Sequence, residues 1–167
     1  MSDRKAGAAS AGRGAATERK AGVPCDEDII LWSLEQARLL RAGRFSELDV
    51  EHMADEIEDV GKSEKRELAS RMAVLLAHLL KWSRQPGKRS KSWRATILNQ
   101  REQIALGIEE TPSLKAVMRD PDWQESAWLD ARAQARKETG LAEEELPEAC
   151  PWTMEQAADA RFLPEEA

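Results

Sequence analysis

One apolar stripe at helical spacing constrains the fold of this chain more than any other feature. Its members are Val50, Met53, Ile57, Val60, Leu68, Met72, Leu75, Leu79 and Trp82. Residues three or four positions apart lie on one face of an α-helix, and the eleven residues from Ile57 to Leu68 make three turns, so both halves of the stripe share a face. Gln85-Pro86-Gly87 ends the pattern. The sequence therefore predicts one long helix over residues 49–83, about 50 Å in length, with this stripe facing the core.

The composition of the whole chain also favours helices. The 167 residues include 26 Ala, 21 Glu and 17 Leu, against 5 Val, 6 Ile, 5 Thr, 2 Phe and no Tyr. A helix with the core stripe Leu31, Leu34, Ala37 and Leu40 is expected between Asp26 and Gly43. Further helices are expected after Ser90 or Ser92, Thr111-Pro112, Asp120-Pro121 and Thr153. We predict an all-α fold, a compact helical domain around one long central helix.

Residues 1–24 differ in composition from the rest. Eleven of them are Ala or Gly, and the segment has a net charge of +3 from five bases and two acids. Such a segment buries too little apolar surface to offset the entropy lost on ordering. We predict a disordered basic leader over residues 1–24 and a single all-helical domain over residues 25–164.

The sequence excludes several classes of protein. The longest uncharged apolar stretch, Met72 to Leu80, is shorter than the roughly 20 residues of a membrane span. Residues 1–24 lack the apolar central region of a secretory signal. Cys25 and Cys150 are the only cysteines, too few for a disulfide scaffold. We therefore expect a cytoplasmic protein with reduced cysteines and no membrane contact.

The charges are sorted into blocks along the chain. Residues 25–61 have a net charge of −8 (11 acids, 3 bases), residues 62–104 one of +8 (11 bases, 3 acids), and residues 105–167 one of −9 (15 acids, 6 bases). The turn over residues 81–94 concentrates cations, namely Lys81, Arg84, Lys88, Arg89, Lys91 and Arg94. This turn can neutralise phosphates, or it can be complemented by acids within the fold, by a second copy or by a protein partner. Trp82 and Trp93 lie on core stripes, so we do not expect them to stack on bases.

Two histidines and several carboxylates are the remaining candidates for a metal-binding or catalytic site. The acid-x-x-His pair Asp49-x-x-His52 is followed by Asp55, Glu56 and Asp59 at helical spacing, which could direct these groups at a metal ion. The second acid-x-x-His pair of a di-metal bundle is missing, however. His78 lies in the most apolar segment, where it is either a general base or a hydrogen-bonded structural group, and we predict the structural role. Because no phosphate loop, nucleophile elbow or zinc-type cysteine pair occurs, we assign no catalytic residue, metal or cofactor.

An ordered series of short motifs resembles a known family. The series includes Leu39-Leu40-Arg41-Ala42-Gly43-Arg44-Phe45, Glu56-Ile57-Glu58-Asp59-Val60-Gly61, His78-Leu79-Leu80-Lys81-Trp82-Ser83-Arg84-Gln85-Pro86, Ser92-Trp93-Arg94-Ala95-Thr96-Ile97 and Leu146-Pro147-Glu148-Ala149-Cys150-Pro151-Trp152. Over residues 25–164 the chain resembles the bacterial family called domain of unknown function twenty-nine. The resemblance implies an all-helical fold in a small bacterial protein, and it brings no activity, cofactor or catalytic residue.

Three functions are compatible with the sequence. We predict a non-catalytic helical protein-interaction module that binds a protein partner, or itself as a homo-oligomer, through segregated acidic and basic surfaces. The first alternative is an RNA or DNA binder that uses the 81–94 turn. The second is a metal-dependent or other enzyme that uses His52, His78 and nearby carboxylates.

Overall fold

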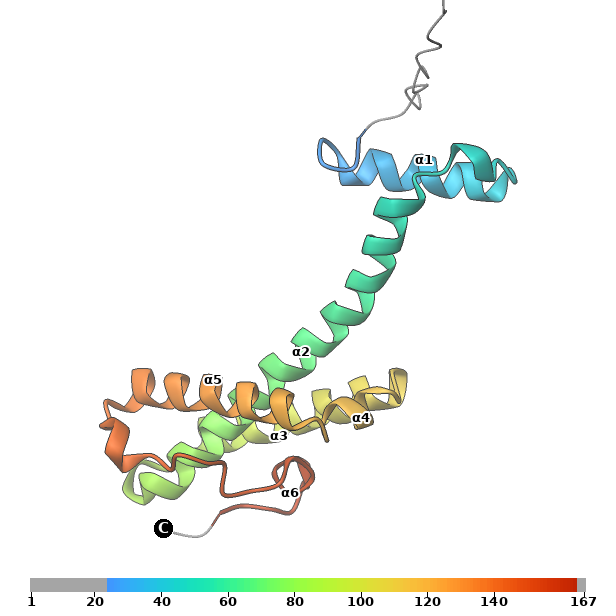
Figure 1. Cartoon of the computed structure of the whole chain (residues 1–167). Coiled ribbons are helices and arrows are strands. Elements are labelled where there is room, and N and C mark those ends of the chain that lie inside the picture. The colour runs from blue at the N-terminus through green and yellow to red at the C-terminus, as the bar shows by residue number, and fades with distance from the viewer. Residues whose placement is uncertain (1–23, 165–167) are drawn as a thin grey trace, which may run out of the picture. The chain divides into compact units, whose positions relative to one another are not determined.

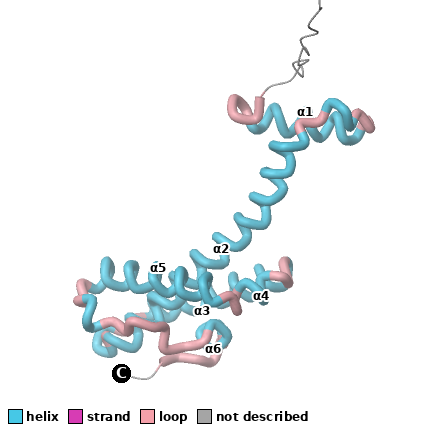
Figure 2. Tube along the Cα trace, in the orientation of Figure 1, coloured by secondary structure: helices cyan, strands magenta, loops and turns pink. Residues whose placement is uncertain are grey.

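The structure, a computed structural model, describes residues 24–164, which form helices and connecting turns without any strand (Figure 1; Figure 2). Its α-helices and 3-10 helices (η) are α1 (Ile29–Arg41), η1 (Phe45–Glu47), α2 (Val50–Arg84), η2 (Pro86–Lys88), α3 (Lys91–Glu110), α4 (Leu114–Val117), α5 (Pro121–Thr139), η3 (Glu143–Glu145) and α6 (Met154–Ala158). The prediction of an all-α fold with one long helix is confirmed, because α2 matches the predicted range 49–83. Except for Pro24, the predicted leader lies outside the described residues.

The described part of the chain divides into two compact units, with the boundary inside α2. The first unit, from residue 24 to residue 55, contains α1, η1 and the start of α2; the second, from residue 56 to residue 164, contains the rest. The single domain over residues 25–164 stays a prediction. None of the helices described here is both long enough and apolar enough to cross a membrane.

In the first unit, α1 does not bury the face that we predicted. Its buried residues are Trp32, Gln36 and Leu39. Two members of the predicted stripe, Leu31 and Leu34, are instead 52% and 63% exposed. The prediction that the stripe from Leu31 to Leu40 faces the core was therefore wrong.

Hydrogen bonds to Asp49 explain which face of α1 is buried. The Gln36 side-chain oxygen accepts a hydrogen bond from the backbone N–H of Asp49 at 2.9 Å. The Trp32 indole N–H donates to Asp49 Oδ2 at 3.2 Å. These bonds tie α1 to the residue that precedes α2, and they require the face with Trp32 and Gln36 to point inward. The spacing of apolar residues in the sequence does not show that these polar groups must be buried.

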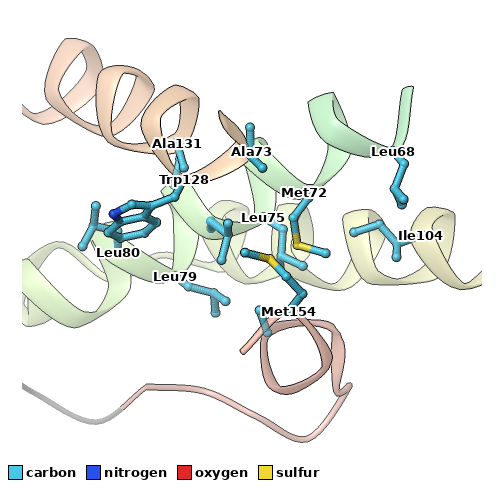
Figure 3. Packing of buried hydrophobic residues seen from close by; sticks show 14 of the residues in the cluster. Leu68, Met72, Ala73, Leu75, Leu79, Leu80, Ile104, Trp128, Ala131 and Met154 are labelled. Atoms are coloured by element: carbon cyan, nitrogen blue, oxygen red, sulfur yellow. The ribbon is translucent and has the colours of Figure 1, made fainter. Parts of the chain in front are cut away.

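The second unit has a hydrophobic core built on the C-terminal half of α2 (Figure 3). Five α2 side chains are completely buried: Met72, Leu75, Leu76, Ala77 and Leu79. Other helices contribute the side chains that surround them, among which are Ile104 of α3, Trp128 and Ala131 of α5, and Met154 of α6. This half of the predicted stripe therefore lies in the core, as expected.

The N-terminal half of the same stripe is exposed. Val50, Ile57 and Val60 are 64%, 68% and 66% exposed, whereas Leu68 is only 3% exposed. The prediction that the whole stripe faces the core was therefore wrong for Val50, Ile57 and Val60, whereas Met53 is half-buried. The helical period decides only which residues share a face, and the amount of chain available to cover that face decides which of them are buried.

Helix boundaries follow the capping residues. Ser90, not Ser92, caps α3, and its hydroxyl accepts from the Trp93 backbone N–H at 3.2 Å. Asp120 caps α5, with Pro121 at the first helical position. Gly140 ends α5 with a φ of +73°, a left-handed conformation in which glycine is favoured because it has no Cβ.

Arg101 of α3 holds the C-terminal segment. It is 5% exposed, and its guanidinium donates to the carbonyls of Ala157, Ala160 and Phe162 at 2.9, 3.5 and 2.6 Å. Burial lowers the pKa of Arg101, but a guanidinium stays charged in a protein. Arg101 therefore satisfies three backbone acceptors with one buried cation.

Candidate functional site

The basic turn over residues 81–94 joins α2, η2 and α3, and two of its six predicted cations are used inside the fold. Lys81 is 3% exposed. The Arg89 Nε donates to the Trp82 carbonyl at 2.9 Å, and its guanidinium lies 5.2 Å from the centroid of the Trp82 ring. The other four cations are exposed: Arg84, Lys88, Lys91 and Arg94. We call these four the basic surface; none of them forms an ion pair with another residue between 24 and 164.

Lys81 belongs to a cluster that connects three helices. Its ammonium group forms an ion pair with Glu138 of α5. The Lys81 Nζ also lies 3.3 Å from His78 Nε2 and 4.9 Å from the centroid of the Trp93 ring of α3. We call Lys81, His78, Trp93 and Glu138 the Lys81 cluster. It covers a buried cation with an acid, an imidazole nitrogen and an aromatic face.

The hydrogen bonds of His78 determine its tautomer. His78 is 8% exposed, and its Nδ1 lies 2.9 Å from the Val74 carbonyl oxygen. Because a carbonyl only accepts, Nδ1 carries the hydrogen and Nε2 accepts from Lys81. Burial lowers the pKa of His78, and the nearby charge of Lys81 lowers it further. Both ring nitrogens of a neutral imidazole are thus engaged, an arrangement that suits the structural role predicted for His78.

The acid of the Lys81 cluster is held in its charged form. Burial by itself would raise the pKa of Glu138, but hydrogen bonds from Lys81 and Gln134 outweigh burial and lower it. Gln134 Nε2 donates to Glu138 Oε1 at 2.9 Å. The cluster therefore holds a charged carboxylate next to a neutral histidine at neutral pH, and protonation of His78 would add a second cation beside Lys81.

We expect the protein to lose stability in mild acid because of His78. The folded state lowers the pKa of His78 below the usual value of about 6.5 for a histidine, so the unfolded state binds the proton more readily. The stabilising contribution is complete above about pH 6.5 and is lost as the pH falls through the folded pKa, with a slope of at most about 1.4 kcal/mol per pH unit. Urea unfolding between pH 7 and pH 5 would measure it, and His78→Gln should flatten the curve.

His52 provides a control, because its pKa is shifted in the opposite direction to that of His78. The pKa of this exposed side chain is raised by its hydrogen bond to Asp49. The contribution of His52 to stability is present at a pH below its pKa in the unfolded state, and it is lost as the pH rises through its pKa in the folded state. His52→Gln should therefore leave the loss of stability in acid in place, and an unchanged curve for His78→Gln would contradict the prediction.

The acids near His52 do not form a metal site with it. The His52 Nδ1 lies 2.8 Å from Asp49 Oδ2, and this contact also lowers the pKa of Asp49. Asp55 and Glu56 are exposed, and Asp59 is paired with Lys62 at 2.8 Å. Between residues 24 and 164 there is no group of three or more His, Cys, Asp or Glu side chains that could hold a metal ion.

Sequence reasoning did not predict a groove in the second unit. A groove of about 970 Å³ is lined by α5 residues, including Trp128 and Leu129, and by the segment 148–156. Cys150 in this segment donates from its thiol to the Trp152 carbonyl at 3.2 Å, and burial raises the pKa of the thiol. A raised pKa disfavours the thiolate, so Cys150 is poorly suited to nucleophilic chemistry.

Sequence reasoning also missed the partner of Lys81. Glu138 is 57 residues away in the chain, and only the packing of α5 on α2 brings the two together. A signal was present, because Lys81 lies three residues after His78 within an otherwise apolar run and a buried lysine needs an acid. The sequence contains 31 acids, however, and does not indicate which of them is the partner.

The fold and these sites define a small all-helical protein with exposed charged surfaces. A comparison with protein families matches residues 25–163 to the family described as Domain of unknown function DUF29, and the chain belongs to this family. The resemblance seen in the motifs is thereby confirmed. Comparisons with curated proteins and with solved structures find no match.

Proposed function

We propose that the protein is a non-catalytic interaction module that binds a protein partner in the bacterial cytoplasm. The contact surface is residues 56–60 of α2, which we call the acidic segment: Glu56, Ile57, Glu58, Asp59 and Val60. One observation carries the proposal. Ile57 and Val60 are about two-thirds exposed, although they continue a stripe that is buried from Leu68 onward.

The energetics of burial support a partner at the acidic segment. Fully burying a side chain of this size stabilises by about 1.5–3 kcal/mol, and Ile57 and Val60 have roughly two-thirds of that gain available. A contiguous apolar stripe rimmed by charges is typical of a protein-binding surface. Glu56, Glu58 and Asp59 outnumber Lys62, the cation that pairs with Asp59, so the segment is net acidic. A basic rim on the partner is therefore the complementary choice, because opposite charges steer association and exclude wrong partners.

The proposed location rests on separate observations. Cys150 has a free thiol, which donates a hydrogen bond to the Trp152 carbonyl and suits a reducing compartment. The motif series over residues 25–164 supports the bacterial origin.

The full-length chain, used as bait in a bacterial lysate, tests the proposal. The parent protein should retain a defined partner at about 0.05 M salt and release it at about 0.5 M, where charges are screened over a few ångströms. Ile57→Glu/Val60→Glu should abolish retention, because it places acids where apolar contacts are needed. Leu129→Glu, at a leucine 52% exposed on α5, is the matched control and should retain the partner. Equal capture by parent and double variant would contradict the proposal.

A second candidate function, binding of RNA or DNA, is favoured by the exposure of the basic surface. Arg84, Lys88, Lys91 and Arg94 make no ion pair within residues 24–164, so their charges are available to phosphates. Base stacking has less support, because Lys81 lies over the ring of Trp93 and Arg89 over that of Trp82. Any such binding would therefore be electrostatic and weakly dependent on sequence.

Charge reversal tests this second function. If the basic surface binds polyanions, Lys88→Glu/Lys91→Glu should lose retention on heparin and on single-stranded RNA, because each change removes one phosphate contact and adds a repulsion. Lys137→Glu reverses an exposed cation near the end of α5 and should keep most of the retention. A parent protein that is not retained at about 0.05 M salt would exclude the function.

A further inference from the structure

We propose that the exposed face of α1 binds α1 of a second copy of this chain, with the two helices antiparallel. The face consists of Ile30, Leu31 and Leu34, flanked by Glu27 in the turn before α1 and by Arg41 at its end. This contact is distinct from the acidic segment of α2. This proposal rests on the proposed function only because it treats the chain as an interaction module. The partner that it names is a second copy of the chain.

The exposed face lies on the side of α1 opposite the buried one. An α-helix turns by 100° per residue, so Trp32 and Gln36, each two residues from Leu34, lie about 200° around the axis from it. Trp32 and Gln36 are 4% and 8% exposed, whereas Ile30 and Leu34 are 69% and 63% exposed. The buried face is thus occupied within the first unit, and the more apolar face is left without cover there.

The small core of the first unit makes this exposure costly. Among residues 24–55, only Trp32, Leu39 and Leu48 are buried apolar side chains. Seven large apolar residues in the same range are exposed: Ile29, Ile30, Leu31, Leu34, Leu40, Phe45 and Val50. Units of this size usually depend on association or on cross-links for stability. Covering the outer face of α1 would supply the apolar burial that the unit lacks.

Charge complementarity identifies a second copy as the occupant. In an antiparallel pair centred on Leu34, residues at equal distances before and after position 34 lie opposite each other. Leu34 then meets Leu34 of the second copy on the twofold axis of the pair. Leu31 meets Ala37 and Glu27 meets Arg41, and each of these two pairs occurs twice. Glu27 and Arg41 are both exposed, and neither forms an ion pair among the described residues. In an antiparallel pair, the apolar residues of this face therefore lie against apolar residues of the second copy, and its charged residues lie against opposite charges.

Only the antiparallel arrangement gives this match. A parallel pair in register would place Arg41 against Arg41 and Glu27 against Glu27, a repulsion at both ends. Antiparallel packing also aligns the positive end of each helix dipole with the negative end of the other. Arg38, which is paired with Glu35 at 2.8 Å in its own helix, can cover the opposing Ile30 with its methylene groups.

The expected dimer is weak and sensitive to salt. The face spans only about 20 Å of helix, by 13 residues at the standard rise, so the interface lies at the small end of specific protein contacts. We expect a dissociation constant on the order of micromolar, and weaker association at high salt because Glu27 and Arg41 are exposed.

Sedimentation velocity of the full chain over a concentration series tests the proposal. The parent protein should pass from monomer to dimer, Leu34→Glu should stay monomeric because it puts two carboxylates at the axis, and Leu129→Glu should dimerise like the parent. Helicity by circular dichroism checks that each variant is folded. A parent protein that is monomeric at all concentrations, or a folded Leu34→Glu that still dimerises, would overturn the proposal.

A charge swap tests the antiparallel pairing directly. Arg41→Glu should weaken dimerisation by about tenfold or more, because Glu27 of the second copy then faces a carboxylate. The double variant Glu27→Arg/Arg41→Glu restores opposite charges and should recover dimerisation to within about threefold of the parent. A double variant that is folded but no better than Arg41→Glu would rule out this pairing.

The outcomes also separate this proposal from the proposed function. If the chain is monomeric but partner capture still depends on Ile57 and Val60, the α1 contact is wrong and the acidic segment stands. If dimerisation depends on Leu34 while Ile57→Glu/Val60→Glu changes no capture, the acidic segment is wrong and the α1 contact stands.

Discussion

Leu75→Ala should lower the free energy of unfolding by about 3 kcal/mol. Leu75 is completely buried in the core of the second unit, where it lies beside Met72 and Leu79 (Figure 3). Truncation to alanine removes apolar contacts and leaves a cavity, because packed helices relax only partly around a missing side chain. Urea unfolding followed by circular dichroism measures the loss.

Ile57→Ala on the same helix is the matched comparison for Leu75→Ala. Ile57 belongs to the same sequence stripe but is 68% exposed, so its truncation creates no cavity. The change should alter the free energy of unfolding by less than about 0.5 kcal/mol, and alanine's higher helix propensity offsets part of that. Similar losses for the two variants would show that residues before Leu68 are packed as tightly as those after it.

Arg101→Met should destabilise the second unit by about 3 kcal/mol. Methionine fills much of the space but leaves the carbonyls of Ala157, Ala160 and Phe162 without their buried donor. Arg101→Lys should lose somewhat less, because an ammonium keeps the charge but cannot reach three acceptors with one planar fork. Chemical unfolding measures the loss, and hydrogen exchange should show reduced protection over residues 154–162.

Arg161→Met is the control for Arg101→Met. The Arg161 side chain is 92% exposed, and its Nε lies 3.7 Å from Asp159 Oδ1. Removing it should change the free energy of unfolding by less than about 0.5 kcal/mol. Equal effects of the two changes would mean that the carbonyl contacts of Arg101 contribute nothing to stability.

The boundaries of the helices could be predicted because they depend on local chemistry. The predicted range 49–83 and the observed helix Val50–Arg84 differ by one residue at each end. Ser90, Asp120 and Gly140 act within one turn of their own positions, through a hydroxyl, a carboxylate and a left-handed backbone. Interactions between residues so close in the chain can be predicted from the sequence.

Partners that are distant in the chain could not be predicted. Arg101 and Phe162 are 61 residues apart, and Lys81 and Glu138 are 57 residues apart. Among the proposed cations of the 81–94 turn, Lys81 is buried and Lys88 is exposed; the apolar run before Lys81 favours its burial, but the sequence does not indicate which acid compensates for it. The distinction arises because Lys81 points toward α5, whose acid compensates for the loss of water around the ammonium.

The sequence by itself determined that the chain is helical, where its helices begin and end, and which residues share a face of each helix, because these depend on propensity, capping and the 3.6-residue period. Only the tertiary structure decided which of those faces is covered. Leu34 lies in an apolar stripe as regular as that of Leu75, and Ile57 lies in the same stripe as Leu75, yet of these three residues only Leu75 is buried. Burial requires other elements to be in contact with a face, and contact between segments far apart in the chain is a property of packing and not of period.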